Sequence, residues 1–240
     1  MKLKTRYQRV ILKISGECLG TPGRGVDPEA LAYVAGEVAP LARAGVQVGM
    51  VAGGGNLIRG RDFPPAQAVQ RLTADYMGML ATVINSLALQ DAMESHGADA
   101  HVLSAIPMGP LCEAYSPWRA IELMEEGCVV IFAAGTGSPL FTTDMCAALR
   151  AGEVQAQAVL KATKVDGVYD ADPEKHPGAK KYKRLTYQKA IRDRLRVMDL
   201  TAISLCMECH IPIVVFRLSA RGNFRRAVMG KAVGTLIHEG

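Results

Sequence analysis

The sequence lacks the long apolar runs and biased segments that mark membrane, secreted or disordered proteins. Its 240 residues are about half hydrophobic, yet no stretch approaches the roughly 18 apolar residues that a membrane span needs. The apolar run after the basic start is interrupted by Lys13, so no signal-type region follows. We find no low-complexity linker and no repeat of solenoid period. These absences predict a cytoplasmic protein that forms one domain over residues 1–240.

The sequence also lacks the motifs of several common enzyme classes. The glycine-rich stretch at 53–60 fits neither the P-loop nor the G-x-G-x-x-G pattern, which disfavours Walker-type NTPases and standard dinucleotide enzymes. No Ser-His-Asp or Cys-His constellation is evident. The net charge of +5 suits an anionic substrate only weakly. The densest basic stretch, 180–184, has Tyr182 as its only aromatic residue, so a solvated loop is favoured over a nucleic-acid site.

The cysteines do not predict a disulfide framework. A cytosolic chain of this size is expected to keep its six cysteines as free thiols. Residues 206–210 match the C-x-x-C-H pattern of c-type haem attachment, but that attachment requires export. We therefore expect neither haem nor a zinc site there, since zinc needs more ligands than this pair supplies.

Short β-branched runs alternate with longer helical patterns along the chain. This order is typical of an α/β protein in which helices cross over between parallel strands. Asp27 and Pro28 predict a capped start for the first helix. The expected strands are residues 9–14, 47–51, 99–103, 128–133, 158–161, 211–216 and 235–237. The expected helices are residues 28–44, 75–96, 117–126 and 223–229, with another starting near Thr143.

Four expected strand ends carry loops that suit chemistry, because ligands of α/β sheets gather at the carboxyl ends of strands. In the first, Lys13 lies within an apolar strand and is followed by Ser15 and Gly16. Burying an ammonium costs free energy unless it meets an anion, and Gly16 allows close backbone approach. A phosphate-binding lysine and an edge-strand lysine that reaches water remain equal alternatives.

The second and third loops suit anion binding by backbone groups. Three glycines at 53–55 can expose consecutive N–H groups, and Arg59 can hold a phosphate through its planar fork, although an ordinary turn is also possible. Residues 135–144 lead into a helix whose N-terminus attracts anions. Thr142 or Thr143 could instead serve only as the helix cap.

The fourth loop, 160–173, is rich in turn signals. The Asp166-Gly167 pair predicts a tight hairpin. Asp172 before proline predicts the start of a turn. Tyr169 can offer a flat face to a base, and the Asp172 carboxylate can bind a ribose hydroxyl.

Together these loops indicate phosphoryl transfer. Lys13, Arg59 and Lys161 supply positive charge, glycines supply backbone donors, and Asp144 can hold the lysines. Phosphoryl transfer requires positioning and charge neutralisation more than covalent help. A phosphate acceptor is largely ionised at neutral pH, so it needs no general base.

The sequence resembles the bacterial uridylate kinases of the amino acid kinase superfamily from about Arg9 to Ile237. The resemblance rests on LKISGE (12–17), GGGNLIRG (53–60), DYMGMLATVIN (75–85), GTGSPLFTTD (135–144) and LKATKVDGVYDADP (160–173). It implies a three-layer αβα sandwich with an open, mainly parallel central sheet. It further implies transfer of the γ-phosphoryl group from ATP to UMP, with Mg²⁺, in pyrimidine nucleotide biosynthesis.

The resemblance also implies roles for individual residues, with acceptor binding in the N-terminal half and ATP binding in the C-terminal half. The implied catalytic residues are Lys13, Arg59 and Asp144. The implied ATP-binding residues are Lys13, Ile14, Ser15, Gly16, Gly55, Arg59, Lys161, Thr163, Tyr169 and Asp172. The implied UMP-binding residues are Gly54, Asp75, Thr136, Gly137, Ser138, Pro139, Leu140, Phe141, Thr142 and Thr143. No protein side chain is expected to hold a metal.

Assembly and regulation follow from the same resemblance. It implies a homohexamer, feedback inhibition by UTP and activation by GTP, with an allosteric loop at Gly20, Thr21, Pro22, Gly23, Arg24 and Gly25. Gln90 and Glu94 stand where basic side chains are expected, which predicts weak or altered GTP activation. Ser138 and Leu140 also depart from the pattern, which bears on UMP affinity. The long apolar helix itself favours an oligomer.

Two other functions remain open. One is a nucleotide-sensing regulator that binds UMP or UTP, and the other is a superfamily kinase of an amino acid carboxylate or carbamate. The Lys13–Asp144 pair favours retained catalysis. Asp199 has two equal interpretations, as a helix cap or as an active-site residue.

Overall fold

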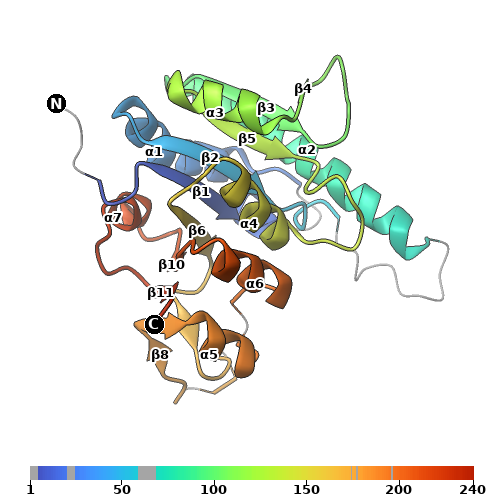
Figure 1. Ribbon diagram of the computed structural model, residues 1–240. Helices are drawn as coiled ribbons and strands as arrows, with labels where there is room; N and C mark the ends of the chain where they lie inside the picture. The colour runs from blue at the N-terminus through green and yellow to red at the C-terminus, as the bar shows by residue number, and fades with distance from the viewer. Residues whose placement is uncertain (1–4, 21–24, 59–68, 174, 177, 196) are drawn as a thin grey trace.

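A central sheet organises the protein, whose structure is a computed structural model (Figure 1). The structure describes residues 5–20, 25–58, 69–173, 175–176, 178–195 and 197–240. Nine strands form the sheet in the order β4-β3-β5-β2-β1-β6-β10-β11-β9. All neighbours are parallel except the antiparallel pair β10 and β11. The expected open, mainly parallel sheet is therefore confirmed.

The strands are short and their bounds follow the apolar runs of the sequence. The sheet strands are β1 Arg9–Ile14, β2 Gln47–Ala52, β3 Ala100–Ser104, β4 Glu113–Ala114, β5 Val129–Ala133, β6 Ala158–Thr163, β9 Arg184–Thr186, β10 Ile213–Arg217 and β11 Thr235–His238. A separate two-stranded ribbon joins β7 Val168–Tyr169 to β8 Lys181–Tyr182. The first strand coincides with its prediction, and the other predicted strands agree to within about two residues.

Helices cover both faces of the sheet. One face carries α1 Pro28–Arg43, α2 Arg71–Ser95 and α7 Asn223–Val228, and the other carries α3 Pro117–Glu125, α4 Thr143–Glu153, α5 Tyr187–Arg192 and α6 Leu200–Glu208. Alternate residues of β1 enter opposite cores, Leu12 on the first face and Ile11 on the second. This period-two alternation is what a strand buried on both sides requires. The predicted three-layer αβα sandwich is confirmed.

Two local predictions need correction. The long helix begins at Arg71 rather than at Asp75. The tight hairpin predicted at Asp166-Gly167 is wrong, because β7 pairs with β8 far along the chain instead of turning back at once. Gly167 is required for packing: a Cβ there would lie 2.8 Å from Thr235 Oγ1.

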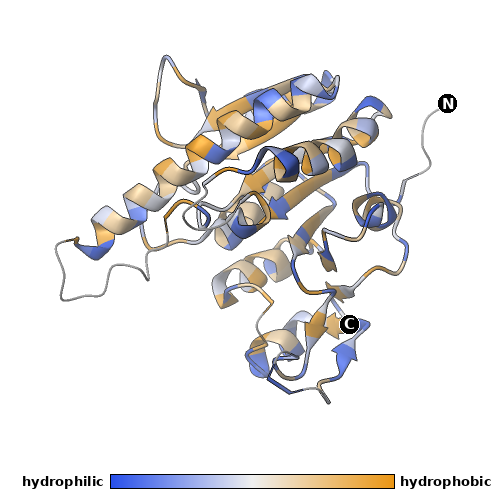
Figure 2. Cartoon of the chain, turned by 180° about the vertical axis from the view of Figure 1, so that it is seen from behind, coloured by the Kyte–Doolittle hydropathy of each residue, from blue (hydrophilic) through white to orange (hydrophobic). Residues whose placement is uncertain are grey.

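The expectation that no stretch is long and apolar enough for a membrane span is wrong for helix α2. Within the described chain it meets that criterion, with 44% of its most apolar window buried. Figure 2 shows apolar residues along much of its length. Yet Thr82, Asn85 and Ser86 are buried in its packed face, and Asn85 hydrogen-bonds to loop backbone. These contacts are those of a core helix against a sheet.

All six cysteines are free thiols, as the sequence predicts. Burial raises the pKa of the Cys206 thiol to about 12 and that of Cys146 to about 11. Neither of these two cysteines is a thiolate at neutral pH. Within the motif, Cys206 is a buried residue of α6, while Cys209, just after the helix, is exposed. The C-x-x-C-H motif is therefore a helix end rather than an attachment site.

Candidate active site

The carboxyl ends of β1, β2, β5 and β6 open onto one edge of the sheet (Figure 1). These four strands are adjacent, so the four loops selected from the sequence meet in space. The edge-strand interpretation of Lys13 is wrong, because β1 lies between β2 and β6 and Lys13 is only 7% exposed.

Asp144 lies between two buried lysines at this edge. Lys13 Nζ is 2.7 Å from Asp144 Oδ1, and Lys161 Nζ donates to Asp144 Oδ2 at 2.6 Å. Lys161 also donates to the Val197 carbonyl. The predicted role of Asp144 in holding the lysines agrees with this geometry, and Lys161 is already bound on two sides.

The electrostatics of this cluster favour an added anion. Burial by itself raises the pKa of Asp144, but Lys13 and Lys161 together hold that pKa below its usual range. Burial lowers the pKa of Lys161, and the attraction of Asp144 only partly opposes this. With both lysines protonated, two ammonium groups face one carboxylate, so the cluster has a net charge of about +1. A phosphate group placed beside it would complete the neutralisation.

The loops after β1 and β2 pack backbone against backbone. A Cβ on Gly16 would lie 2.6 Å from Gly55 N and 2.7 Å from Gly53 O, so only glycine fits there. A Cβ on Gly54 would lie 2.8 Å from the Gly78 carbonyl of α2. These glycines therefore have a packing role of their own, independent of the phosphate binding predicted from the sequence. Arg59 lies outside the described residues.

Two asparagine side chains bind each other and fix the glycine loop after β2, residues 53–56, to α2. Asn56 and Asn85 donate to each other's side-chain oxygens at 3.0 and 2.8 Å. Asn85 also donates to the Gly53 carbonyl at 2.7 Å. Sequence reasoning missed both residues, and the available signal was a polar side chain at a buried helical position.

Two other predicted ATP-binding residues, one at the end of β1 and one directly after it, differ in what they can offer. Ile14 is fully buried in the core, so only its backbone can face the site. Ser15 is half-buried, and its Oγ lies 3.3 Å from Cys18 Sγ.

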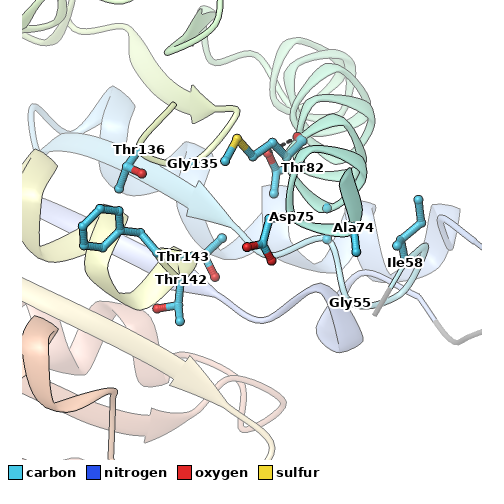
Figure 3. Close-up of a pocket in the computed structure, with 13 residues that line it drawn as sticks. Gly55, Ile58, Ala74, Asp75, Thr82, Gly135, Thr136, Thr142 and Thr143 are labelled. Atoms are coloured by element: carbon cyan, nitrogen blue, oxygen red, sulfur yellow. Dashed lines mark hydrogen bonds between the residues drawn. The ribbon is translucent and has the colours of Figure 1, made fainter. Parts of the chain in front are cut away.

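A cavity of 290 Å³ lies beside the glycine loop, between α2 and the loop that precedes α4 (Figure 3). It brings together seven predicted site residues with six others. The lining is Gly54, Gly55, Ile58, Ala74, Asp75, Gly78, Met79, Thr82, Gly135, Thr136, Phe141, Thr142 and Thr143. Its size is near the lower end of typical ligand pockets, about 300–1,000 Å³.

Asp75 connects the two walls of this cavity. Its Oδ2 accepts the Leu140 backbone N–H at 3.0 Å, and its Oδ1 lies 3.0 Å from Arg71 Nε. The carboxylate thus reaches from α2 to the opposite loop. Since Asp75 lines the cavity, its oxygens are placed to accept from a ligand hydroxyl.

The predicted acceptor loop, residues 136–143, lines the cavity only in part. Thr136 Oγ1 donates to the Ser138 carbonyl at 3.1 Å. Leu140 is 64% exposed with φ of 72°. Gly137 is in contact with Ala105, whose carbonyl a Cβ at this position would meet at 3.0 Å. Gly137, Ser138, Pro139 and Leu140 are not among the lining residues.

Hydrogen bonds show that two further predicted residues cap helices. Thr142 is the N-cap of α4 and accepts from the backbone N–H groups of Asp144 and Met145 at 3.1 and 3.2 Å. Both Thr142 and Thr143 line the cavity. Asp199 is the N-cap of α6, accepts from Ala202 N at 2.8 Å, and also accepts from the Thr142 hydroxyl.

The ATP-binding residues predicted at and after the end of β6 do not line this cavity. Thr163 lines a second cavity of 270 Å³. Tyr169 donates its hydroxyl to Asp166 at 2.6 Å. The Asp172 carbonyl accepts from His176 N at 2.8 Å, which confirms the predicted turn. Tyr169 and Asp172 line neither of these two cavities.

The predicted allosteric loop is described only at its two ends. A Cβ on Gly20 would lie 1.8 Å from the Gly25 carbonyl, so the ends are in close contact. Asn56 Nδ2 donates to the same carbonyl at 3.2 Å. Thr21, Pro22, Gly23 and Arg24 lie outside the described residues.

Comparison with known proteins decides the family. Residues 8–217 match the amino acid kinase family. The chain belongs to this family. The mainly parallel sheet between helix layers is that of the amino acid kinase fold.

Three solved structures resemble this amino acid kinase over nearly its full length. A UMP kinase from Bacillus anthracis is 36% identical with a TM-score of 0.93, covering 97% of this chain and 96% of that one. A UMP kinase from Ureaplasma parvum is 37% identical with a TM-score of 0.90, covering 98% and 100%. A uridylate kinase from Archaeoglobus fulgidus is 31% identical with a TM-score of 0.74, covering 95% and 99%.

The described part of this amino acid kinase holds no group of three or more His, Cys, Asp or Glu residues that could bind a metal ion. Both oxygens of Asp144 already face ammonium groups.

Proposed function

We propose that this protein is a UMP kinase, which transfers the γ-phosphoryl group of ATP to UMP to give UDP. The observation that carries the proposal is the buried Lys13–Asp144–Lys161 cluster at the carboxyl ends of the strands. The cavity lined by Asp75 lies beside it, since Thr143, the neighbour of Asp144, lines the same cavity. Similarity to UMP kinases at 36 and 37% identity supports it. The enzyme would act in the cytoplasm, in pyrimidine nucleotide biosynthesis.

The two halves of the chain take different substrates in this proposal. Residues 1–240 form one domain with an acceptor-binding N-terminal half and an ATP-binding C-terminal half. UMP occupies the cavity against Asp75 and the loop 136–143. ATP lies across the ends of β1 and β6, toward Thr163 and the β7 segment.

The chain contributes charge and position to the reaction. Lys13 neutralises the phosphoryl group in transfer, and Asp144 orients the Lys13 ammonium toward it. Lys161 is a positioning residue, since Asp144 and the Val197 carbonyl already hold its ammonium. UMP presents an ionised phosphate oxygen, so no general base is needed.

Mg²⁺ enters as part of the ATP substrate. Mg²⁺ keeps several waters and binds substrate phosphates readily, without an all-protein cage. This fits a site in which Asp144 has both oxygens engaged by lysines. Bound with ATP, the ion would supply neutralisation of phosphate charge that the lysines do not reach.

A coupled assay of ADP release tests the function directly. The protein is offered ATP with UMP, CMP, glutamate, aspartate or carbamate as acceptor. We expect turnover with UMP, because a ribose fits the Asp75 carboxylate and, among the described lining residues, no lysine or arginine offers a site for a carboxylate acceptor. Turnover with an amino acid in place of UMP would refute the proposal. UMP binding without turnover would support a regulator instead.

Asp75→Asn is expected to weaken UMP binding far more than ATP binding. The carboxylate can accept from both ribose hydroxyls, whereas the amide offers one oxygen and a competing donor. Asp91→Asn, at an exposed site on the same helix, is the matched control. Calorimetry with each nucleotide measures the effect. An equal loss of affinity for UMP and ATP would contradict the assignment of Asp75.

We propose a homo-oligomer, a hexamer, that buries an apolar stripe on α2. Leu72, Tyr76, Leu80 and Ile84 follow one another at four-residue spacing and are 46–52% exposed. Such a stripe on a helix that already packs its other face favours a partner. Light scattering at micromolar concentration should give an oligomer, and Leu80→Lys should reduce the mass. A monomer for the unmodified chain would contradict this.

Regulation by nucleotides is also proposed, with UTP as an inhibitor and GTP as a weak activator. Gln90 donates to Glu94 at 3.0 Å on the exposed side of α2, so this segment presents no cation to a triphosphate. The measurement is initial rate against GTP at subsaturating UMP. Strong activation at micromolar GTP would show that this interpretation of Gln90 and Glu94 is wrong.

A further inference from the structure

The turn that follows β5 has an unusual backbone. Ala134 and Gly135 both have φ of 58°, in the left-handed region. Glycine adopts this region freely, but alanine does so at a cost in free energy because of its Cβ. Both residues are buried, and they open the loop that lines the cavity. The surrounding contacts must therefore impose this conformation.

The first contact comes from α2. Thr82 Oγ1 accepts the Ala134 backbone N–H at 3.0 Å and donates to the Met79 carbonyl at 2.6 Å. Thr82 is only 3% exposed and points from α2 toward the cavity (Figure 3). With both its donor and its acceptor used, the hydroxyl has a fixed orientation, and it fixes the Ala134 amide in turn.

The second contact comes from α4, on the opposite side of the sheet. Arg150 Nη2 donates to the Gly135 carbonyl at 3.3 Å, and Arg150 Nη1 lies 2.6 Å from Glu153 Oε2. The guanidinium stacks on the Tyr115 ring, 3.7 Å from its centroid, and Tyr115 donates its hydroxyl to Glu153 at 2.6 Å. Burial, together with the Glu153 bond, raises the pKa of Tyr115, so the phenol remains a donor at neutral pH.

Arg150, Glu153 and Tyr115 thus form one rigid unit. Arg150 is only 4% exposed, and an arginine buried to that degree requires a paired charge. None of the three residues lines the cavity. Among the described residues, the Gly135 carbonyl is the link that joins them to the cavity lining.

We propose that Arg150, held by Glu153 and Tyr115, is a positioning residue that together with Thr82 clamps the Ala134-Gly135 turn and so sets the acceptor loop for UMP. The inference rests on the proposed function, since it takes the loop as the UMP site. Loss of the clamp lets Ala134 return to ordinary backbone angles, which displaces Thr136 from the cavity. Affinity for UMP falls, while the ATP side of the site is unchanged.

The experiment compares Arg150→Lys with Arg119→Lys as the matched control. Lysine keeps the charge but cannot stack on Tyr115 while donating in two directions. Arg119 forms surface ion pairs with Glu113 and Glu122 and lies outside the proposed site. We expect Arg150→Lys to raise the KM for UMP at least tenfold and to leave the KM for ATP within about twofold. Equal changes in both KM values, or none, would overturn the positioning role.

Two further variants keep the test decisive if Arg150→Lys folds poorly. Tyr115→Phe retains the stacked ring and removes only the bond to Glu153, so a smaller rise in the UMP KM is expected. Ala134→Gly allows the left-handed turn without cost and should restore part of the UMP affinity lost in Arg150→Lys or Tyr115→Phe. A further rise of the KM in the double variant would contradict the clamp.

Hydrogen exchange supplies a readout independent of UMP turnover. Amides at 135–142 should exchange faster in Arg150→Lys or Tyr115→Phe than in Arg119→Lys, and unchanged exchange would overturn the inference. If the unmodified protein does not phosphorylate UMP, the proposed function fails, while faster exchange at 135–142 would still support the clamp.

Discussion

Lys13→Ala is expected to lower kcat by about 10²–10³ while the fold survives, because the lost donor stabilises charge that develops in the transition state. The structure explains why folding should tolerate the change. Asp144 keeps Lys161 as a partner at 2.6 Å, so no buried carboxylate is left unpaired. The KM for UMP should change much less than kcat, since Asp75 and the loop 136–143 are untouched.

The measurement is steady-state kinetics with a thermal melt on the same samples. Lys189→Ala is the matched control, because Lys189 is paired with Asp193 at the surface, away from the site. Near-normal kcat in a folded Lys13→Ala protein would exclude Lys13 from the chemistry. A large loss of stability would show instead that the lysine is structural.

Much of the fold follows from local pattern. The strand Arg9–Ile14 was predicted to the residue because it is a short apolar run bounded by polar residues. The start of α2 was missed because Gln70 makes no capping hydrogen bond through its side chain and the first turn has no acidic residue. Helix α5 was not predicted, and its six residues are too few to show a period.

Site residues whose type is unusual for their place in the sequence could be predicted. Site residues that act through contacts formed only in the folded chain could not. A lysine inside an apolar strand signals a buried charge, and the loop at 135–144 offers one carboxylate, Asp144, to hold it. Arg150, Thr82 and Asn85 were missed because they bind backbone atoms remote in sequence, such as the carbonyl of Gly135 or of Gly53. No spacing in the sequence records such a contact.

Asp144→Asn should have the largest effect on stability, a loss of about 3–5 kcal/mol at neutral pH, because it removes the counter-charge of buried ions. Lys13 and Lys161 would then face each other without a carboxylate between them, at side-chain exposures of only 9 and 12%. The asparagine is nearly the same size, so the loss reports charge rather than packing. Activity should fall as well, since Lys13 loses the group that orients it.

The pH dependence of this loss gives a sharper test. The pKa of Asp144 is lowered in the folded protein, so its contribution is complete above its unfolded pKa of about 3.9 and is lost as pH falls through the lower folded value. The pKa of Lys161 is lowered by burial, and without Asp144 it should fall further. Between that folded pKa and the unfolded value of about 10.4 the unfolded chain binds more protons, so stability of the variant rises with pH.

The difference in unfolding free energy between the unmodified protein and Asp144→Asn should therefore be greatest near neutral pH. It should shrink toward acid, where Asp144 is protonated. It should also shrink as pH rises from the lowered pKa of Lys161 in the variant toward about 10, because the folded variant then holds that lysine uncharged. Urea unfolding at a series of pH values measures it, and Asp193→Asn, at the surface ion pair with Lys189, is the control. A difference that stays constant from pH 3 to about pH 10 would mean that the two lysines do not depend on Asp144 for neutralisation.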